Sequence, residues 1–552
     1  MLIKTKDYSL IMSAEQTTTP LYTCTENGGI ALDTSGSIII DYFMMYTRSL
    51  TKEQNYKYIE KCWSISPVKT VAIIFNGRDR LTGKKEKRVS NQAMLWLREH
   101  KPYTYMNNIL TYVNKYGRWK DLLYICYENT GDGMLSKNYE LTLFADKLIE
   151  DVSNLKGCEN KEEGEENDKN VCNISLCAKW APSENDRNDS RKHFAKKIAT
   201  ILFGKDDNKK MEKYRKEYLA PLRNKINIVE KLICNNEWDK INYECVPGVA
   251  SKRLHKAFNN HDCERYCEYL SKVREGTAKI NVTGILPHEL ANYYVNLRNT
   301  HDEYTENETI ELQWRTIVDN VKKCGILGNS LAVIDLSGSM FSASNGSIPA
   351  QVAISLGIIT SQCCNGMFKN KFITFSDKPE LVSLIPDDLY KEYTERGIEP
   401  SLYTCFKSLI DVDFGYNTDF VKCCDAIIKY GKENNINDED MPKKLFIFTD
   451  MQFDEANVDN ENKCIETVYK TIAKKFKAND YTPPKFIFWN LNSCHKESFP
   501  VNCKTEGTAM ISGFSEQLLK IFMSYDEFKP ELIVNEILEP YIKEIVIDDT
   551  EV

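Results

Sequence analysis

One short segment of the chain holds side chains that could bind a metal ion. The apolar run at 331–334 is followed by Asp335-Leu336-Ser337-Gly338-Ser339, which puts one carboxylate and two hydroxyls in a loop that contains glycine. Oxygen ligands of this kind suit a hard, octahedral cation such as Mg²⁺ and do not suit zinc or copper. The pattern therefore predicts a magnesium-binding loop at the end of a strand.

Two later loops carry candidates for further ligands. Thr418 stands directly before an expected helix, and Asp450 follows the apolar run at 445–448. In an α/β sheet the carboxyl ends of parallel strands meet at one edge, so we expect these loops to lie together. The candidate metal ligands are therefore Asp335, Ser337, Ser339, Thr418 and Asp450.

This set resembles the metal-ion-dependent adhesion site (MIDAS) of von Willebrand factor A (vWA) domains, over about residues 326–528. In that family an Asp-x-Ser-x-Ser loop, a threonine and an aspartate surround one Mg²⁺, which implies the same roles for the five residues above. Met451 departs from the pattern, because many vWA domains have glycine after the aspartate. The alternative is that the first loop only caps the next helix and binds no ion.

A near-copy of the motif occurs close to the N-terminus, at Asp33-Thr34-Ser35-Gly36-Ser37. It follows Asn27-Gly28-Gly29 instead of a predicted strand, and no partner loops accompany it. We expect a turn or a helix cap there, not a metal site.

The sequence shows none of the common catalytic motifs. It has no Gly-x-Ser-x-Gly elbow, no Gly-x-x-x-x-Gly-Lys-Ser/Thr loop and no His-Glu-x-x-His. Hydrolysis at a metal would also need a positioned base or nucleophile. We therefore expect a non-enzymatic protein whose Mg²⁺, or another divalent cation, accepts an outside carboxylate or phosphate oxygen. A metal-dependent phosphoesterase is the enzymatic alternative.

Size and composition indicate a folded, multidomain protein. A chain of 552 residues is long enough for about two to four domains. The net charge of −8 argues against a surface that binds nucleic acid everywhere, but not against a local basic surface. We see no secretory signal and no apolar run long enough to span a bilayer. We therefore expect a cytoplasmic protein with no membrane partner, and reduced thiols for its 19 cysteines.

The chain divides into two parts by the period of its apolar residues. After an N-terminal tail at 1–20, residues 21–325 show helical periodicity and almost no strand pattern, which predicts an all-α, helical-repeat-like domain. An acidic stretch at about 157–170 has almost no apolar residue, so we expect a disordered loop there. The clearest expected helices are 91–98, 106–115, 139–151, 193–203, 214–234 and 261–274.

From 326 to 528 strands and helices alternate, which predicts a doubly wound α/β domain with a mostly parallel sheet. Residues 529–552 form a C-terminal extension. Expected strands are 330–335, 371–376, 381–385, 444–450 and 485–490, and expected helices are 351–363, 419–431, 464–476 and 514–523.

Two stretches of the helical part are basic despite the acidic average. Residues 78–88 hold six basic against two acidic residues, and residues 191–225 hold twelve against four. Such clusters can neutralise nucleic-acid phosphates, although each alone could be a solvated helical face. The candidate RNA-binding residues are Arg78, Arg80, Lys84, Lys85, Lys87, Arg88, Arg191, Lys192, Lys196, Lys197, Lys209, Lys210, Lys213, Arg215 and Lys216.

A segment between these stretches, Tyr116-Gly117-Arg118-Trp119-Lys120, has a structural interpretation. Gly117 can end one helix and Trp119 can anchor the next, with Arg118 and Lys120 facing outward.

The two-part layout resembles the Ro autoantigen (TROVE) architecture, a group of ring-shaped RNA-binding proteins. Closer still, the chain resembles a eukaryotic and large-DNA-virus family of unknown function with the same layout. The motifs that carry this resemblance are Asn27-Gly28, Arg78-Asp79 with Gly83 and Arg88, Tyr116-Gly117-Arg118-Trp119, Leu176 with Lys179-Trp180, Val246-Pro247 and Thr449-Asp450-Met451-Gln452-Phe453.

Together these patterns favour a binding protein that holds RNA on basic helical surfaces and has a magnesium-dependent docking site. The alternative is a protein-interaction scaffold that uses the metal site to capture an acidic residue of a partner protein.

Overall fold

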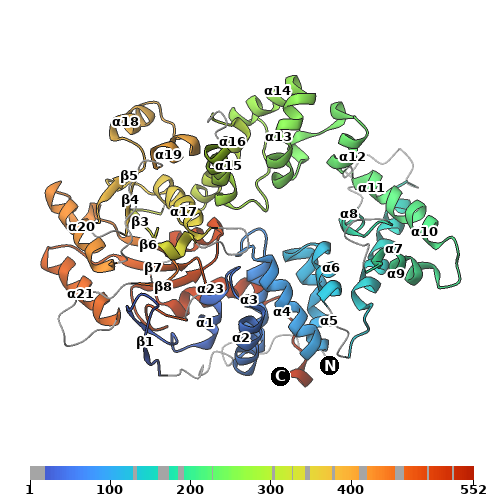
Figure 1. Ribbon diagram of the computed structural model, residues 1–552, viewed down its shortest axis with the longest axis horizontal. Coiled ribbons are helices and arrows are strands. Elements are labelled where there is room, and N and C mark those ends of the chain that lie inside the picture. Colours follow the sequence, from blue (N-terminus) through green and yellow to red (C-terminus); the bar gives the residue numbers. More distant parts are fainter. Residues whose placement is uncertain are drawn as a thin grey trace.

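The computed structural model describes residues 19–128, 134–159, 173–184, 192–226, 228–300, 305–325, 327–341, 348–375, 379–409, 419–453, 465–493, 497–524 and 527–552. It has an N-terminal helical region followed by a sheet of six strands flanked by helices (Figure 1). In this view the sheet lies on the left, and the helical region runs from the lower centre around the right side to the top. The predicted order of an α-helical part and then an α/β part is confirmed.

A short antiparallel hairpin, β1 (Tyr22–Cys24) and β2 (Ile30–Leu32), precedes the helical region. The helices are α1 (Ile38–Met45), α2 (Lys52–Ile65), α3 (Pro67–Arg78), α4 (Lys87–His100), α5 (Pro102–Thr111), α6 (Trp119–Glu128), α7 (Tyr139–Glu159), α8 (Cys177–Trp180), α9 (Phe194–Phe203), α10 (Lys210–Lys213), α11 (Ala220–Ile226), α12 (Val229–Cys234), α13 (Gly248–His261), α14 (Cys263–Arg274), α15 (Pro287–Thr300) and α16 (Glu308–Lys322). π-helical turns at Tyr112–Tyr116 and Tyr214–Leu219 continue α5 and lead into α11.

Helix α16 illustrates why these segments are helical. Ile310, Trp314, Ile317 and Val321 recur at helical spacing and are all buried. At its start, Asn307 Oδ1 accepts a hydrogen bond from the backbone N–H of Ile310 at 3.2 Å. Five of the six expected helices occur, within α4, α5 and its π-helical turn, α7, α9 and α14.

The sixth expected helix, 214–234, is not continuous. α11 ends at Ile226 and α12 begins at Val229. Leu222 belongs to the main hydrophobic core, whereas Val229 and Leu232 pack into a second, smaller core with Tyr243. A single straight helix could not supply both cores, so the prediction of one helix was wrong.

The sheet has the order β5-β4-β3-β6-β7-β8, and every neighbouring pair is parallel except β4 with β5. Val333 of β3 pairs with Ile447 of β6, which pairs with Phe488 of β7. Apolar residues fill both faces of these central strands because helices cover both faces. The strands are β3 (Ser330–Ile334), β4 (Lys371–Thr374), β5 (Leu381–Ser383), β6 (Lys444–Thr449), β7 (Lys485–Asn490) and β8 (Thr508–Ser512).

All five expected strands are present, and β8 is an addition. The expected helix at 514–523 is a 3₁₀ turn at Glu516–Lys520 followed by one short helix. The helices of this part are α17 (Pro349–Cys363), α18 (Asp387–Glu395), α19 (Leu402–Leu409), α20 (Phe420–Glu433), α21 (Ile465–Ala478), α22 (Ile521–Ser524) and α23 (Pro530–Ile542).

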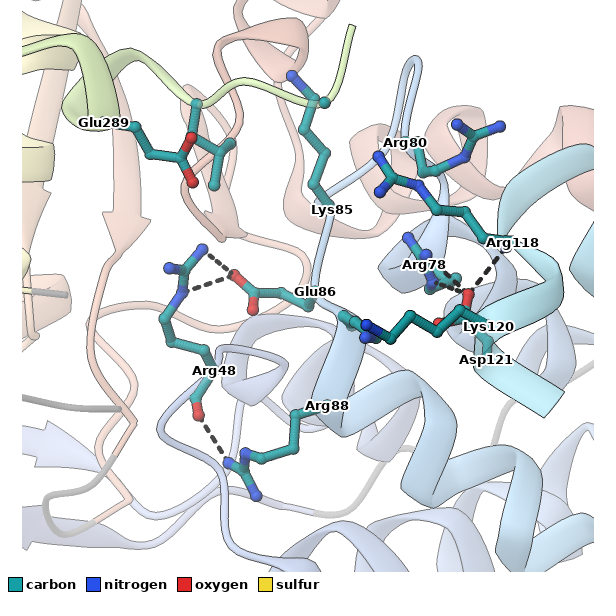
Figure 2. Close-up of a pocket in the computed structure, with 13 residues that line it drawn as sticks. Arg48, Arg78, Arg80, Lys85, Glu86, Arg88, Arg118, Lys120, Asp121 and Glu289 are labelled. Carbon is teal, nitrogen blue, oxygen red and sulfur yellow. Dashed lines mark hydrogen bonds and ion pairs between the residues drawn. The ribbon is translucent and has the colours of Figure 1, made fainter. Parts of the chain in front are cut away.

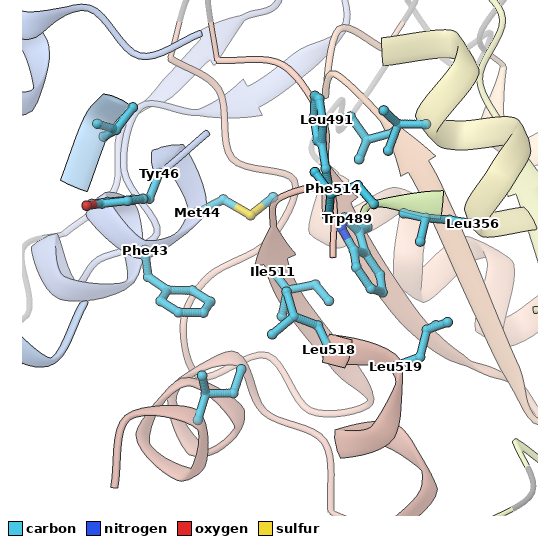
Figure 3. Close-up of a cluster of buried hydrophobic side chains, with 14 of the residues drawn as sticks. Phe43, Met44, Tyr46, Leu356, Trp489, Leu491, Ile511, Phe514, Leu518 and Leu519 are labelled. Atoms are coloured by element: carbon cyan, nitrogen blue, oxygen red, sulfur yellow. The ribbon is translucent and has the colours of Figure 1, made fainter. Parts of the chain in front are cut away.

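The two parts of the chain are packed together through a shared core. Figure 3 shows Phe43 and Met44 of α1 beside Ile511 of β8, and all three are buried. α23 packs against both β8 and α3. The Tyr541 hydroxyl donates to Asp79 Oδ2 at 2.8 Å, so the C-terminal helix fixes the end of α3.

The last residues of the chain return to the helical region. Glu551 accepts hydrogen bonds from the backbone N–H groups of Tyr103 at 2.9 Å and Thr104 at 2.8 Å, at the start of α5. In the described residues no helix is both long and apolar enough to cross a membrane. Cys158, in the last turn of α7, is disulfide-bonded, so the expectation of reduced thiols throughout was wrong.

Candidate functional site

The loop between α3 and α4 is fixed tightly against the end of α3. Asp79 Oδ1 accepts from the backbone N–H of Leu81 at 2.8 Å, and Lys84 N–H donates to Asn76 O at 3.0 Å. A Cβ on Gly83 would lie 2.0 Å from Asn76 O, so only glycine fits there. The charged side chains on this loop consequently project from a fixed backbone.

These side chains contribute to a pocket of about 480 Å³, which we name the cationic pocket (Figure 2). Its wall comes from the loop after α1, from the segment that runs from the end of α3 to the start of α4, from the start of α6 and the residue before it, and from residues 284–289 at the start of α15. The lining residues are Arg48, Arg78, Arg80, Lys85, Glu86, Lys87, Arg88, Arg118, Lys120, Asp121, Gly284, Leu286 and Glu289. Eight of them are basic and three are acidic, so the lining carries a net charge of 8 − 3 = +5.

Carboxylates engage some of the basic side chains. Arg78 donates to Asp121 Oδ2 from Nε at 2.9 Å and from Nη2 at 2.7 Å. Arg48 Nη2 lies 3.2 Å from Glu86 Oε1. Lys85 Nζ lies 3.1 Å from Oε1 of Glu516, a residue of the α/β part. The third acid of the lining, Glu289, pairs outside the basic set, with Lys252 at 3.5 Å.

The other basic side chains have no acidic partner within the described part of the chain, namely Arg80, Lys87, Arg88, Arg118 and Lys120. Arg88 donates to the backbone oxygens of Arg48 at 2.6 Å and Leu50 at 2.7 Å, so it fixes the loop after α1. Lys120 Nζ lies over the Trp180 ring. Figure 2 shows Arg80 and Arg118 on the same side of the pocket as Arg78.

Arg80 and Arg118 are held in an unfavourable electrostatic setting. The Nε atom of Arg80 is buried without a hydrogen-bond partner. Burial, and then the charges of Arg118 and Arg78, lower the pKa of Arg80. Burial and the charge of Arg78 likewise lower the pKa of Arg118. Basic side chains that outnumber the nearby carboxylates repel one another, which favours the binding of an anion among them.

Lys84, which the sequence analysis grouped with these residues, is turned away from the pocket. It is fully buried, and its ammonium donates to Ser512 Oγ at 2.7 Å and to Phe43 O. Burial lowers the pKa of Lys84 well below its usual value. Lys84 therefore links the α3–α4 loop to the end of β8 and is inaccessible to a ligand.

The second basic stretch lies on α9, α10 and the following π-helical turn, and none of its residues lines the cationic pocket. Lys213 pairs with Asp207 at 2.6 Å and Lys216 with Glu212 at 2.6 Å. Arg191 lies outside the described residues. Exposed members are Lys196, Lys197, Lys209, Arg215 and Lys216, while Lys192, Lys210 and Lys213 are partly buried.

The two candidate metal-binding carboxylates lie at the ends of adjacent strands. Asp335 follows β3 and Asp450 follows β6, and both are buried. Asp335 accepts from Ser337 N–H at 2.9 Å and from the Thr449 hydroxyl at 2.6 Å. Ser337 Oγ lies 3.1 Å from Ser339 Oγ. Four of the five predicted ligands therefore flank one edge of the sheet, and the fifth, Thr418, lies outside the described residues.

Burial raises the pKa of Asp335, and the nearby charge of Asp450 raises it further. Two buried carboxylates this close are stabilised by a bound cation. Met451 has φ +67°, a left-handed conformation that glycine adopts more easily than methionine, so the backbone is strained at this position.

The β1–β2 turn holds the loop that follows Asp450. Asn27 Nδ2 donates to Gln452 O at 2.8 Å, and the Thr25 hydroxyl donates to Phe453 O at 2.6 Å. Two motifs separated by more than 400 residues of sequence are thus in direct contact.

The near-copy of the metal motif forms a turn before α1, as predicted. Asp41 accepts from the Ser35 backbone N–H at 2.8 Å and from the Thr34 hydroxyl, while Asp33 Oδ1 accepts from Leu21 N–H. The expectation that no strand precedes it was wrong, because β2 ends at Leu32 and pairs with Phe499 beside the α/β part.

Some pocket residues were not predicted from the sequence. Arg118 and Lys120 were expected only to face outward, while Gly117 and Trp119 have the structural roles predicted for them. Arg48 and Glu289 carry no local signal, because they reach the pocket only through the packing of distant segments.

Two known protein families match this chain. The model of DUF2828, a domain of unknown function, matches residues 25–142 and 139–327, and that of DUF7788, another domain of unknown function, matches residues 329–540. The chain belongs to the DUF2828 family. It is 32% identical over 544 residues to "Uncharacterized protein L728" of Acanthamoeba polyphaga mimivirus, covering 94% of this chain and 87% of that protein. The expected membership of a family of unknown function is confirmed.

Proposed function

We propose that this protein is a non-enzymatic binding protein that takes up single-stranded RNA at the cationic pocket. The observation that supports the proposal most is the gathering of eight basic side chains from three separate segments around one cavity of about 480 Å³. Clustered arginine and lysine side chains bind phosphates by releasing the counterions of the nucleic acid. Arginine also forms paired hydrogen bonds to phosphate oxygens.

The size of the cavity favours a single strand. A volume of about 480 Å³ is in the range of sites for one small ligand and is too small to enclose a duplex. Single-stranded RNA can present one unstacked nucleotide to such a site. The proposal is of binding without catalysis, since Asp121 and Glu86 are engaged in ion pairs and Glu289 in a third.

The test is fluorescence anisotropy of a labelled single-stranded RNA with purified protein across a range of salt concentrations. We expect binding that weakens steeply with salt, and a loss of about 10-fold or more for Lys87→Gln/Lys120→Gln, two exposed cations of the pocket. The matched control is Lys209→Gln/Lys216→Gln, which removes two exposed cations outside the pocket. A single-stranded DNA of the same sequence shows whether the 2′-hydroxyl contributes.

Equal losses in the two double variants would contradict the assignment to the pocket and favour diffuse binding along the helical surface. No binding by the unmodified protein at physiological salt would contradict the RNA proposal itself.

A divalent cation at the strand ends is the second part of the proposal. The strand order reverses between β3 and β6, and in open α/β sheets this switch point is where ligands bind. The described donors, Asp335, Ser337, Ser339 and Asp450, are all oxygen ligands and fit Mg²⁺. We infer from the order of these ligands that this part of the chain is a vWA-like domain, and from the two-part layout that the helical region is TROVE-like. Thr418 completes the proposed set.

The alternative function is a scaffold in which this cation takes a carboxylate of a partner protein. The buried Asp335–Asp450 pair favours it, since Mg²⁺ held there would keep a coordination position for an outside ligand. The test is co-purification with and without EDTA, for the unmodified protein and Asp335→Ala. Partners that survive both changes would contradict this alternative.

A further inference from the structure

We infer that the cationic pocket binds a phosphate monoester, the terminal phosphate of a nucleic-acid strand or of a free nucleotide, in preference to an internal phosphodiester. This inference rests on the proposed function for the strand and adds which phosphate the pocket selects.

Three of the eight basic side chains are neutralised, by Asp121, Glu86 and Glu516. Arg88 is occupied by backbone oxygens. Four cationic groups then remain for a ligand, on Arg80, Lys87, Arg118 and Lys120. An internal phosphodiester carries one negative charge, whereas a phosphate monoester carries about 1.5 to 2 at neutral pH and has three terminal oxygens. The surplus of cations matches the monoester better.

The two remaining guanidinium groups come from elements whose positions are fixed. Arg80 projects from the loop that Asp79 and Gly83 lock onto the end of α3. The backbone N–H of Arg118 donates to Asp121 Oδ2 at 2.9 Å, the oxygen that also accepts from Arg78. The backbone that carries these two guanidinium groups is therefore preorganised for binding.

The wall opposite Arg118 has no side chain at its nearest point. A Cβ on Gly284 would lie 3.1 Å from Arg118 Nη2, and Gly284 has φ +80°. Bare backbone at this position leaves the space beside the guanidinium open to a ligand oxygen. The buried, unpartnered Nε of Arg80 provides a further donor on the same side of the pocket.

An internal phosphodiester would need the strand to enter and leave the site, with cations along a continuous track. Here the free cations gather in one pocket, and the basic residues of α9 and α10 are not part of its wall. A strand end or a mononucleotide needs only one entrance. The number of remaining cations and their gathering in one pocket thus both favour a terminal phosphate monoester.

The experiment compares one RNA of about ten nucleotides in three forms: with a 5′-phosphate, with a 3′-phosphate, and with hydroxyls at both ends. Binding is measured by competition anisotropy. Adenosine monophosphate and inorganic phosphate are further competitors, and their effect on the melting temperature is recorded. We expect a phosphorylated end to improve binding about 10-fold or more over the RNA with two hydroxyl ends.

Arg80→Gln and Arg118→Gln should each abolish that preference, while Lys209→Gln/Lys216→Gln should keep it. Arg315→Gln, at an exposed ion pair with Asp319, controls for loss of any surface arginine. Circular dichroism and thermal melting establish that the variants fold.

The outcomes separate this inference from the proposed function. Equal affinity for all three RNA forms overturns the monoester preference but leaves RNA binding intact. A second outcome is that RNA does not bind, while adenosine monophosphate stabilises the unmodified protein but not Arg118→Gln. That result supports the monoester site, identifies a free nucleotide as the source of the phosphate and overturns the RNA proposal. A lack of response to every phosphate probe overturns both.

Discussion

Asp121 Oδ2 accepts both hydrogen bonds of the Arg78 guanidinium, at 2.9 Å from Nε and 2.7 Å from Nη2. The same oxygen accepts from the backbone N–H of Arg118 at the start of α6. The pair thus joins the end of α3 to the start of α6 and fixes one wall of the cationic pocket.

Asp121→Asn should destabilise the protein strongly. It leaves the buried Arg78 guanidinium without its counterion, and the amide keeps only one acceptor oxygen for the donors of Arg78, Arg118 and Asn91. We expect a loss of about 3 kcal/mol in the free energy of unfolding, measured by urea denaturation. The control is Lys216→Ala, which breaks an exposed pair with Glu212 and should cost about 0.5 kcal/mol or less. Equal losses in both variants would contradict the role of the Arg78–Asp121 pair.

Asp41 should make stability depend on pH. Burial raises the pKa of Asp41 to about 6, although hydrogen bonds from Ser35 and Thr34 act in the opposite direction. In the unfolded chain this carboxyl loses its proton near pH 3.8. Between these values the native state holds a proton that the unfolded state has lost, so stability falls as the pH rises. Above about pH 6 the destabilisation is complete, at about 3 kcal/mol.

Asp41→Asn should remove this dependence, because asparagine is uncharged. Its oxygen can still accept from the Ser35 backbone N–H, and its Nδ2 can donate to the Thr34 hydroxyl. Unfolding free energies measured from about pH 4 to about pH 7 should diverge in favour of the variant as the pH rises. Asp33→Asn, on the same turn but exposed, serves as the control. Parallel curves for the Asp41 variant and the unmodified protein would refute the prediction.

Much of the sheet could be predicted because its central strands are continuous apolar runs, such as residues 445–448. β8 was missed for a physical reason. Thr508–Ser512 has small and polar residues at its ends, and its burial depends on α1 and α23, which come from opposite ends of the chain. Tertiary packing, not local pattern, defines that strand.

The two candidate sites also differ in how far they could be predicted from the sequence. The metal site could be predicted because Asp335 and Asp450 each directly follow an apolar strand, and these two strands are neighbours in the sheet. The cationic pocket combines residues near 48, 80, 118 and 286, of which only the stretch at 78–88 is visibly basic. Within that stretch Lys84 points into the core, where its ammonium donates to Ser512 at the end of β8, whereas Lys85 and Lys87 line the pocket.

Salt should stabilise the folded protein when no anion is bound in the cationic pocket. Screening weakens the repulsion among Arg78, Arg80 and Arg118, so moderate sodium chloride should raise the melting temperature of the unmodified protein. Arg80→Gln/Arg118→Gln should melt no lower than the unmodified protein at low salt and should respond less to salt. Arg315→Gln removes an exposed cation that pairs with Asp319 and should leave the response to salt unchanged. A double variant with the full salt response would show that these arginines do not repel one another measurably.

Magnesium should stabilise the protein through Asp335 and Asp450. In the absence of a cation the two buried carboxylates repel each other, so Asp450→Asn should melt at a higher temperature than the unmodified protein in EDTA. Added Mg²⁺ should reverse that order, since a ligand at 100 times its dissociation constant adds about 2.7 kcal/mol to the native state. Asp33→Asn, in the near-copy of the motif, should respond to Mg²⁺ like the unmodified protein. Thermal melting in EDTA and in Mg²⁺ measures all three proteins. A Mg²⁺ effect that persists in Asp450→Asn, or that disappears in Asp33→Asn, would place the cation elsewhere.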